Sequence, residues 1–262
     1  YIIIYNILLY IIYLFMKTLN IVAIVLLVLL IIWVLSYLFF KTNIIFDTIL
    51  DANETYSEDK NMIKSKNIPM NSTSNFAMSI WFFVDNWGNN IANDKNILFL
   101  SENIISPHKN VEIKLDKYNN NLNISLKRHT LTDDEDSKIT QDFKITNIPI
   151  QKWVCLTISV DNKTVDVYLD GKLRNSFVMD NTYNQTSENK SDLNIYLGNT
   201  NSNGFQGFIT RFRYIPHSID PEYSYNIYRY GINKSQLNSL YNKYSLKVSF
   251  LEYDKPVGEF SI

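Results

Sequence analysis

The acidic residues of this sequence are the first candidates for chemistry, because paired carboxylates hydrolyse glycosides and clustered carboxylates bind Ca²⁺. The densest group is the run of consecutive acids Asp133–Asp136. A retaining glycosidase needs two carboxyl groups about 5–5.5 Å apart, which alternate residues of one strand supply. The run lacks that alternation, and it also lacks the ligand spacing and the glycine of an EF-hand loop. We therefore expect a solvated loop here, with no catalytic role and no support for Ca²⁺ binding.

Other reactive side chains are few and scattered. Cys155 is the one cysteine, so the sequence has no internal disulfide framework and no all-cysteine zinc cluster. The three histidines, His108, His129 and His217, are too far apart for a recognisable metal-ligand spacing. The sequence also lacks a serine nucleophile elbow, a phosphate-binding loop and a dinucleotide fingerprint. It therefore predicts a protein that is not an enzyme and that needs neither a metal nor a cofactor.

A carbohydrate site is the remaining chemical candidate, because sugars are recognised by aromatic rings next to carboxylates and amides. Trp87 follows Asp85 and Asn86 at the end of an apolar run. Its ring would stack on a sugar while the two polar side chains bond to hydroxyl groups. The polar loop at 199–203 is a second candidate. The competing interpretation, which we favour, is that Trp87 packs at a strand end and that the asparagines form turns.

The balance of charge argues against nucleic acid as a partner. The 262 residues include 25 Lys and Arg against 26 Asp and Glu, for a formal net charge of −1. Domains that bind nucleic acid neutralise phosphates with clustered positive charge, and a net charge near zero gives no such footprint. A chain of this length suits one large domain with an appendage, or two small domains.

Residues 18–40 are apolar almost throughout and contain no charged residue. At about 1.5 Å per residue they span about 34 Å, enough for a hydrocarbon core about 30 Å thick. A buried core helix of this length would have a polar face, and a cleavable signal peptide would have a shorter apolar region. We expect a single-pass transmembrane helix, flanked by Lys17 and Lys41. The charges around it do not define its orientation.

The segments on either side of the predicted helix have different roles. Residues 1–17 form a short N-terminal segment in which the first methionine is Met16. The simplest interpretation is that translation starts at Met16 and that 1–15 are upstream sequence read in frame. The alternative is a second hydrophobic segment, although it is short for a spanning helix. Residues 41–74 are polar and lack sustained periodicity, so we expect a stalk or linker.

The region 75–232 shows the alternation of apolar and polar residues that is typical of strands, with turn signals between the runs. Asp170-Gly171 predicts a hairpin turn in which Gly171 has a positive φ. We expect Trp153 and Leu169, on the two arms of this hairpin, to lie in or beside the core. Many short strands with polar outer faces predict an all-β, antiparallel sandwich. The strand-like runs are FAMSIWFFV, VEIKLD, LNISLK, WVCLTISV, TVDVYLDG, LNIYLG and GFITRFRYI.

The last segment, 233–262, changes period. Apolar residues at helical spacing between Lys234 and Tyr244 predict a short helix, and LKVSFLEY then returns to strand alternation. We expect this C-terminal helix and strand to pack on the sandwich.

Two parts of the sandwich region resemble laminin-G-like, concanavalin A-like jelly rolls. The runs WVCLTISV and VDVYLDGKL are similar to the core hairpin of that family, and NIYLGN with GFQGFITRFRYIPHSIDP is similar to its second signature. With FAMSIWFFV, the resemblance covers roughly residues 75–230. It implies a concanavalin A-like jelly roll. Cys155 stands where such proteins have a polar residue, and we expect it to be a small buried side chain.

A narrower resemblance involves NIPIQKWVCLTISV, DVYLDGKL, YNIYRYG and the ending NKYSLKVSFLEYDKPVGEFSI. These runs, together with the anchor, are similar to membrane-anchored jelly-roll proteins of large nucleocytoplasmic DNA viruses. The resemblance implies a non-enzymatic structural virion protein, such as a minor capsid protein, in the virion inner membrane or associated with the capsid. Its partners would be the lipid bilayer and other capsid or membrane proteins, contacted through strand edges and exposed aromatics such as those in Tyr223–Tyr230. The alternative is a membrane-tethered, lectin-like attachment module that binds a glycan.

Overall fold

The computed structural model describes ten stretches of the chain. They are residues 16–18, 22–34, 44–70, 73–88, 90–106, 109–130, 139–185, 193–232, 247–252 and 255–261. The chain divides into two compact units, residues 1–43 and 44–262, which are described separately below.

The first unit contains an apolar helix, Met16–Val34, with a mean hydropathy of 2.6 and no part of it buried. It is long and apolar enough to cross a membrane, although a signal sequence near the N-terminus would have the same character. The helix overlaps most of the predicted span 18–40. Residues 1–15 and 35–43 lie outside the described residues, so the expected start at Met16 stays a prediction.

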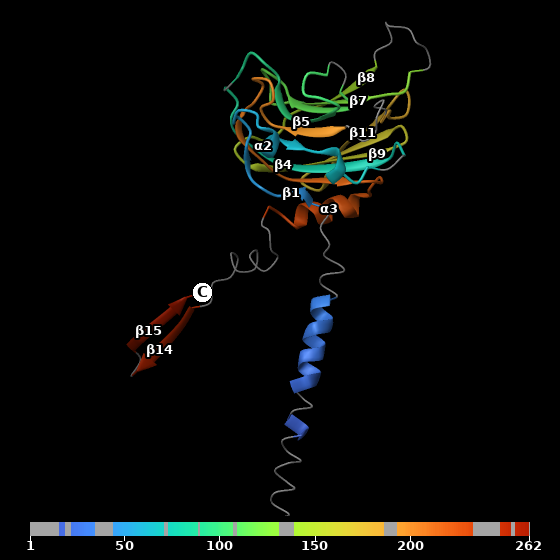
Figure 1. Ribbon diagram of the computed structural model, residues 1–262. Helices are drawn as coiled ribbons and strands as arrows, with labels where there is room; N and C mark the ends of the chain where they lie inside the picture. The colour runs from blue at the N-terminus through green and yellow to red at the C-terminus, as the bar shows by residue number, and fades with distance from the viewer. Residues whose placement is uncertain are drawn as a thin grey trace, which may run out of the picture. The chain divides into compact units, whose positions relative to one another are not determined.

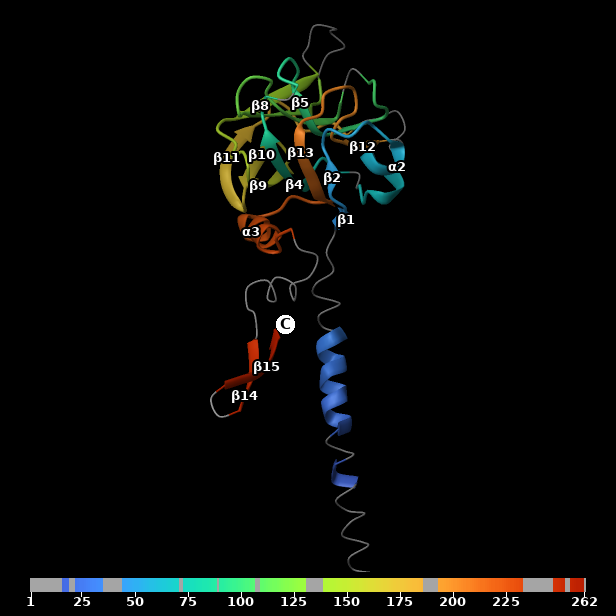
Figure 2. The same ribbon diagram turned by 90° about the vertical axis from the view of Figure 1, so that its left-hand side faces the viewer.

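The second unit is built around two antiparallel sheets that pack face to face, as Figure 1 and Figure 2 show. In the described part of the chain, the first sheet has the order β1 (Ile44–Phe46), β13 (Gln206–Ile215), β4 (Phe76–Asn86), β9 (Trp153–Asp161), β10 (Thr164–Leu169) and β11 (Lys172–Val178), with β2 (Leu50–Asp51) also paired to β13. The second has the order β3 (Met62–Ile63), β12 (Asn194–Leu197), β5 (Lys95–Ser101), β6 (Val111–Leu115), β7 (Leu122–Lys127) and β8 (Thr140–Ile145). The predicted all-β, antiparallel sandwich is confirmed.

The core lies between the two sheets and follows the alternation of the sequence. In β4, Phe76, Met78, Ile80, Phe82 and Val84 all face the main core. The strand β9 contributes every second residue in the same way, and β6 and β7 do so from the opposite sheet. Successive side chains of a strand point to opposite faces, so one half of each strand is committed to the core.

The other face of the first sheet carries a second, smaller apolar cluster beneath the helix α3 (Pro221–Arg229). Asp220 is the N-cap of this helix, and its carboxylate accepts a hydrogen bond from Tyr223 N at 2.7 Å. The ring of Tyr228 stacks on Trp81, with centroids 5.8 Å apart. Cys155 is fully buried in this cluster, and burial raises the pKa of its thiol to about 11. The expectation of a small buried side chain at Cys155 is therefore confirmed.

The predicted hairpin is present, with β10 and β11 joined at Asp170-Gly171. Gly171 has a φ of +74°, as expected, and Asp170 has a φ of +51°. Leu169 is half-buried against the main core, and Trp153 is half-buried against the second cluster. Leu169 therefore lies beside the main core, and Trp153 lies beside the second cluster.

The expected stalk at 41–74 is wrong for most of its length, because residues 44–68 form part of the sandwich. β1 and β2 pair with the edge of β13, and β3 pairs with the edge of β12. Leu50, Ala52, Ile63 and Ile68 are all buried. Two short elements, α2 (Glu58–Asn61) and the 3₁₀ turn η1 (Ser65–Asn67), link these strands. Strands of two or three residues are too short to show alternation, so their partners decide their structure.

At the C-terminus, β14 (Lys247–Glu252) and β15 (Lys255–Ser261) form a hairpin of their own. The predicted strand in LKVSFLEY is confirmed by β14. The helix predicted between Lys234 and Tyr244 falls outside the described residues. Its packing on the sandwich, together with that of the strand, stays a prediction.

The role of residues 44–70 is testable by truncation. We expect residues 44–262 to form a soluble, cooperatively unfolding domain. A fragment 71–262 should have a free energy of unfolding lower by at least about 4 kcal/mol, because Leu50, Ile63 and Ile68 each contribute about 1.5–3 kcal/mol when buried. Urea denaturation followed by circular dichroism compares the two fragments. Equal stability would show that 44–70 are a linker after all.

The hairpin turn gives a second test with a matched control. A Cβ on Gly171 would lie 2.9 Å from both Tyr225 Cα and Tyr228 Cβ in α3, whereas a Cβ on Gly231 would meet no atom within 4 Å. Both glycines have a positive φ, so Gly171→Val and Gly231→Val share the backbone strain. We expect Gly171→Val to lose about 1–3 kcal/mol more in thermal unfolding, because it also overpacks against α3. A smaller loss than that of Gly231→Val would contradict the close packing of the helix.

Candidate functional site

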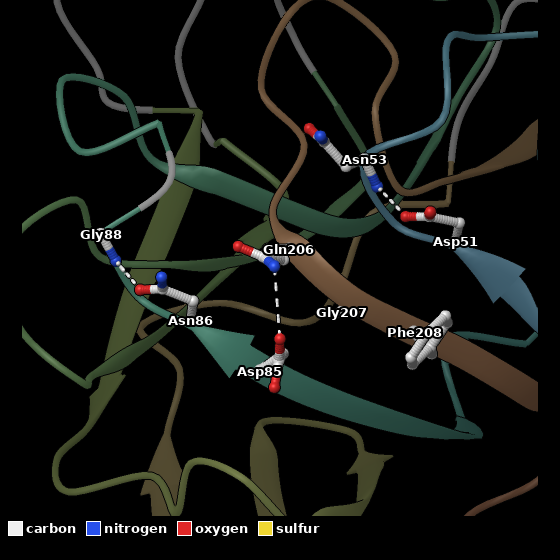
Figure 3. Close-up of a pocket in the computed structure, with 8 residues that line it drawn as sticks. All are labelled: Asp51, Asn53, Asp85, Asn86, Gly88, Gln206, Gly207 and Phe208. Atoms are coloured by element: carbon white, nitrogen blue, oxygen red, sulfur yellow. Dashed lines mark hydrogen bonds between the residues drawn. The ribbon is translucent and has the colours of Figure 1, made fainter.

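A polar pocket of about 630 Å³ lies where β2, β4 and β13 come together (Figure 3). The pairing of these strands brings its walls into place, since Gln206 is opposite Asn86 and Phe208 is opposite Asp51. Gly207 is required at the centre, because a Cβ on it would lie 2.0 Å from Phe83 O. The lining residues are Asp51, Asn53, Asp85, Asn86, Gly88, Gln206, Gly207 and Phe208.

The polar groups of the pocket are arranged by short hydrogen bonds that use only part of their capacity. Gln206 Nε2 donates to Asp85 Oδ2 at 3.3 Å, and Asn53 N donates to Asp51 Oδ1 at 2.9 Å. Asn86 Oδ1 accepts from Gly88 N at 2.9 Å. Among the described residues, the second oxygen of each carboxylate, Gln206 Oε1 and Asn86 Nδ2 have no protein partner. The pocket therefore offers both donors and acceptors to a ligand with several hydroxyl groups.

An aromatic row extends from the pocket across three strands of the first sheet. It consists of Phe208 on β13, Phe83 on β4 and Trp153 on β9, which are directly opposite one another in register. Neighbouring ring centroids are 6.3 Å and 5.6 Å apart. Phe208 is 41% exposed, and the other two rings are half-buried. Such a row is a rigid apolar platform beside a polar pocket.

The structure separates the three residues that the sequence analysis grouped as a glycan site. Asp85 and Asn86 line the pocket. Trp87 instead packs against the main core, with its indole Nε1 buried and Lys95 Nζ lying 5.2 Å from its ring centroid. Its packing at a strand end agrees with the interpretation that we favoured. Binding of a glycan at Asp85 and Asn86 stays a prediction.

The loop at 199–203, the second glycan candidate, is held by its own side chains. Asn203 Oδ1 accepts hydrogen bonds from Thr200 N at 3.2 Å and from Asn201 N at 3.3 Å. Asn199 Nδ2 donates to Asn53 O at 3.1 Å. These asparagines therefore form a turn and attach it to Asn53, which follows β2.

Sequence reasoning missed the aromatic row, although a signal for it was present. Phe83 and Trp153 occupy the outward positions of β4 and β9, where an exposed sheet face usually has polar residues. The pairing that places Phe208 beside them joins segments more than a hundred positions apart. Only the register of β13 on β4 brings the three rings together.

The described residues contain no group of three or more His, Cys, Asp or Glu that could hold a metal ion. The acidic run Asp133–Asp136 lies outside the described residues, so its expected role as a solvated loop stays a prediction. Cys155 is fully buried, and burial raises the pKa of its thiol to about 11, which disfavours the nucleophilic thiolate at neutral pH.

Comparison with known proteins identifies the family. Residues 57–222 match a laminin G-like family model of the concanavalin A-like lectin/glucanases superfamily. The match covers more than half of the chain, so the chain belongs to this superfamily. It begins in the segment that we had expected to be a stalk. No curated protein matches the chain.

Solved structures with the same type of fold include binding domains of botulinum neurotoxins. The binding domain of serotype G has a TM-score of 0.49 at 16% identity, covering 71% of this chain and 45% of that one. The binding domain of neurotoxin DC in complex with rat synaptotagmin II has a TM-score of 0.44 at 15% identity, covering 61% and 36%. This chain therefore spans less than half the length of these structures, and the likeness is too distant to identify a ligand.

Proposed function

We propose that the chain is a membrane-anchored, non-enzymatic binding domain. The observation that carries the proposal is the aromatic row Phe208–Phe83–Trp153, which stays accessible on the outer face of the first sheet beside the part that α3 covers. Large accessible rings on a rigid sheet contribute more binding energy per residue than polar side chains do. The apolar helix Met16–Val34 supports the anchor.

The non-enzymatic part of the proposal rests on the chemistry of the pocket. Its two carboxylates, Asp51 and Asp85, come from different strands and not from alternate positions of one strand. Asp85 is bonded to Gln206 and Asp51 to the backbone of Asn53, which suits ligand recognition. The thiol of Cys155 is buried, and burial raises its pKa, so it does not supply an accessible nucleophile.

As the specific form of this function, we propose a structural virion protein. The resemblance to membrane-anchored jelly-roll proteins of large DNA viruses includes both the anchor and the C-terminal strand. In this role the sandwich would contact capsid-shell or membrane proteins, from the virion inner membrane or beside the capsid. The aromatic row would be its contact surface.

Photo-crosslinking in purified particles tests the virion role. A photoreactive phenylalanine at position 208 should capture a shell or membrane protein, which mass spectrometry then identifies. The control is the same photoreactive residue at position 105, in the loop between β5 and β6 of the second sheet. Ile105 is 82% exposed, and the control should capture little. Absence of the protein from purified particles would reject the virion role.

The polar pocket favours a second candidate function, a membrane-tethered glycan-binding module. Sugars are held by hydrogen bonds to their hydroxyls together with contact of a ring face, and the pocket places Asp85 and Gln206 near Phe208. This function needs the same anchor and the same end of the sheet. It differs in the partner, which would be a glycan and not a protein.

Calorimetric titration distinguishes the glycan role, with an array first used to select the sugar. For the full chain in an uncharged detergent, we expect saturable binding that Phe208→Ala and Asp85→Asn each weaken at least about tenfold, or about 1.4 kcal/mol. Ile105→Ala is the matched control and should bind as the wild type does. Circular dichroism shows that each variant is folded. Silence across a broad array, with and without Ca²⁺, would reject a glycan partner.

A further inference from the structure

A bulge in β13 turns two arginines to the outer face of the first sheet. The register of β13 on β4 shifts between Thr210 and Arg213, which adds one residue to β13. Arg211 has a φ of +52°, and Phe212 enters the main core. Arg213 is opposite Ser79, on the outer face. Positive φ is costly for a residue with a long side chain, so the bulge maintains a strained arrangement.

Both guanidinium groups meet the same short segment, Tyr230–Ile232, which follows α3. Arg211 Nη1 donates a hydrogen bond to Gly231 O at 2.7 Å. Arg213 Cζ lies 5.9 Å from the ring centroid of Tyr230. The two cations are therefore neighbours, and each is only 3% exposed.

The two arginines differ in how their charges are balanced. Asp47 Oδ1 lies 3.7 Å from Arg211 Nε. Within the described part of the chain, no carboxylate pairs with Arg213, and its Nε is buried without a hydrogen-bond partner. Burial, followed by the charge of Arg211, lowers the pKa of Arg213 to about 10, so it stays charged at neutral pH. A buried guanidinium without an anion is unfavourable, and among the described residues Arg213 has none.

We propose that Arg211 and Arg213 form an anion-binding site that takes one singly charged oxyanion, a phosphate diester. One such group would neutralise the charge of Arg213. Its oxygens match the planar forks of two guanidinium groups, which bind phosphate and carboxylate in a bidentate manner.

The position of the pair in the chain points to lipid headgroups as the source of this phosphate, and this step rests on the proposed membrane anchor. Arg213 pairs with Ile44, the first residue of β1. Only residues 41–43 separate Ile44 from the end of the predicted span 18–40. A spanning anchor so close in sequence would give the site a high effective concentration of lipid phosphate diesters.

Access to the arginine pair requires the movement of one segment. A Cβ on Gly231 would meet no atom within 4 Å, so this part of the cover faces open space. Displacement of Tyr230 and Gly231 would expose both guanidinium groups while α3 stays on Trp81. The free energy of binding the anion would offset the free energy that this displacement costs.

Thermal unfolding of the full chain in an uncharged detergent tests the site. The probes are inorganic phosphate and short-chain phosphatidylglycerol, each compared with chloride at equal ionic strength. We expect the unfolding midpoint to rise with the logarithm of the anion concentration, by about 3 °C for each tenfold excess of the anion over its dissociation constant. A rise with phosphatidylglycerol alone identifies a lipid headgroup, and an equal rise with inorganic phosphate identifies a free oxyanion.

Arg213→Met removes the charge at similar volume and should abolish the rise, whereas Arg174→Gln, at an exposed arginine on β11, should preserve it. The absence of any rise over chloride in the wild-type chain overturns the proposal, even if Arg213→Met fails to fold. So does a rise that persists in Arg213→Met. Alkaline extraction of membranes tests the anchor separately, so a failed anchor and a failed anion site give different results.

Discussion

The alternation of side chains along β4, β9 and β13 is the constraint on which the rest of the sandwich depends. Each strand gives one face to the main core, so its other face must be covered or left to solvent. The helix α3 covers one end of that outer face through Trp81, Cys155 and Ile227. At the other end the aromatic row stays accessible beside the polar pocket. The candidate binding surface is therefore the part of the outer face that α3 does not reach.

Residues 44–63 have a second role, because they pair with one open edge of each sheet. Without β1, β2 and β3, the strands β13 and β12 would expose unpaired backbone groups, which favour aggregation. The same segment supplies Asp51 and Asn53 to the pocket and Asp47 to the arginine pair. Edge protection and both candidate sites thus depend on residues that directly follow the predicted membrane span.

The bulge in β13 determines which side chains of this strand face the core. It keeps Phe212 in the core while Arg211 and Arg213 both reach the end of α3. A regular continuation of the strand from Ile209 would instead turn Arg211 and Arg213 toward the core and Phe212 away from it. The strain at Arg211 and the unbalanced charge at Arg213 both oppose folding, which is the physical reason to expect an anion between them.

The sequence by itself determined the class of fold, because runs such as FAMSIWFFV and WVCLTISV alternate over enough residues to define a buried face. It also determined the apolar helix, the hairpin at Asp170-Gly171 and the place of Asp85 and Asn86 at a strand end. Only the tertiary structure decided the fate of residues 44–70, since strands of two or three residues have no pattern of their own. It likewise decided that Trp87 is packed and that Phe208 joins Phe83 and Trp153. Such groupings depend on the register between distant strands, which local periodicity does not encode.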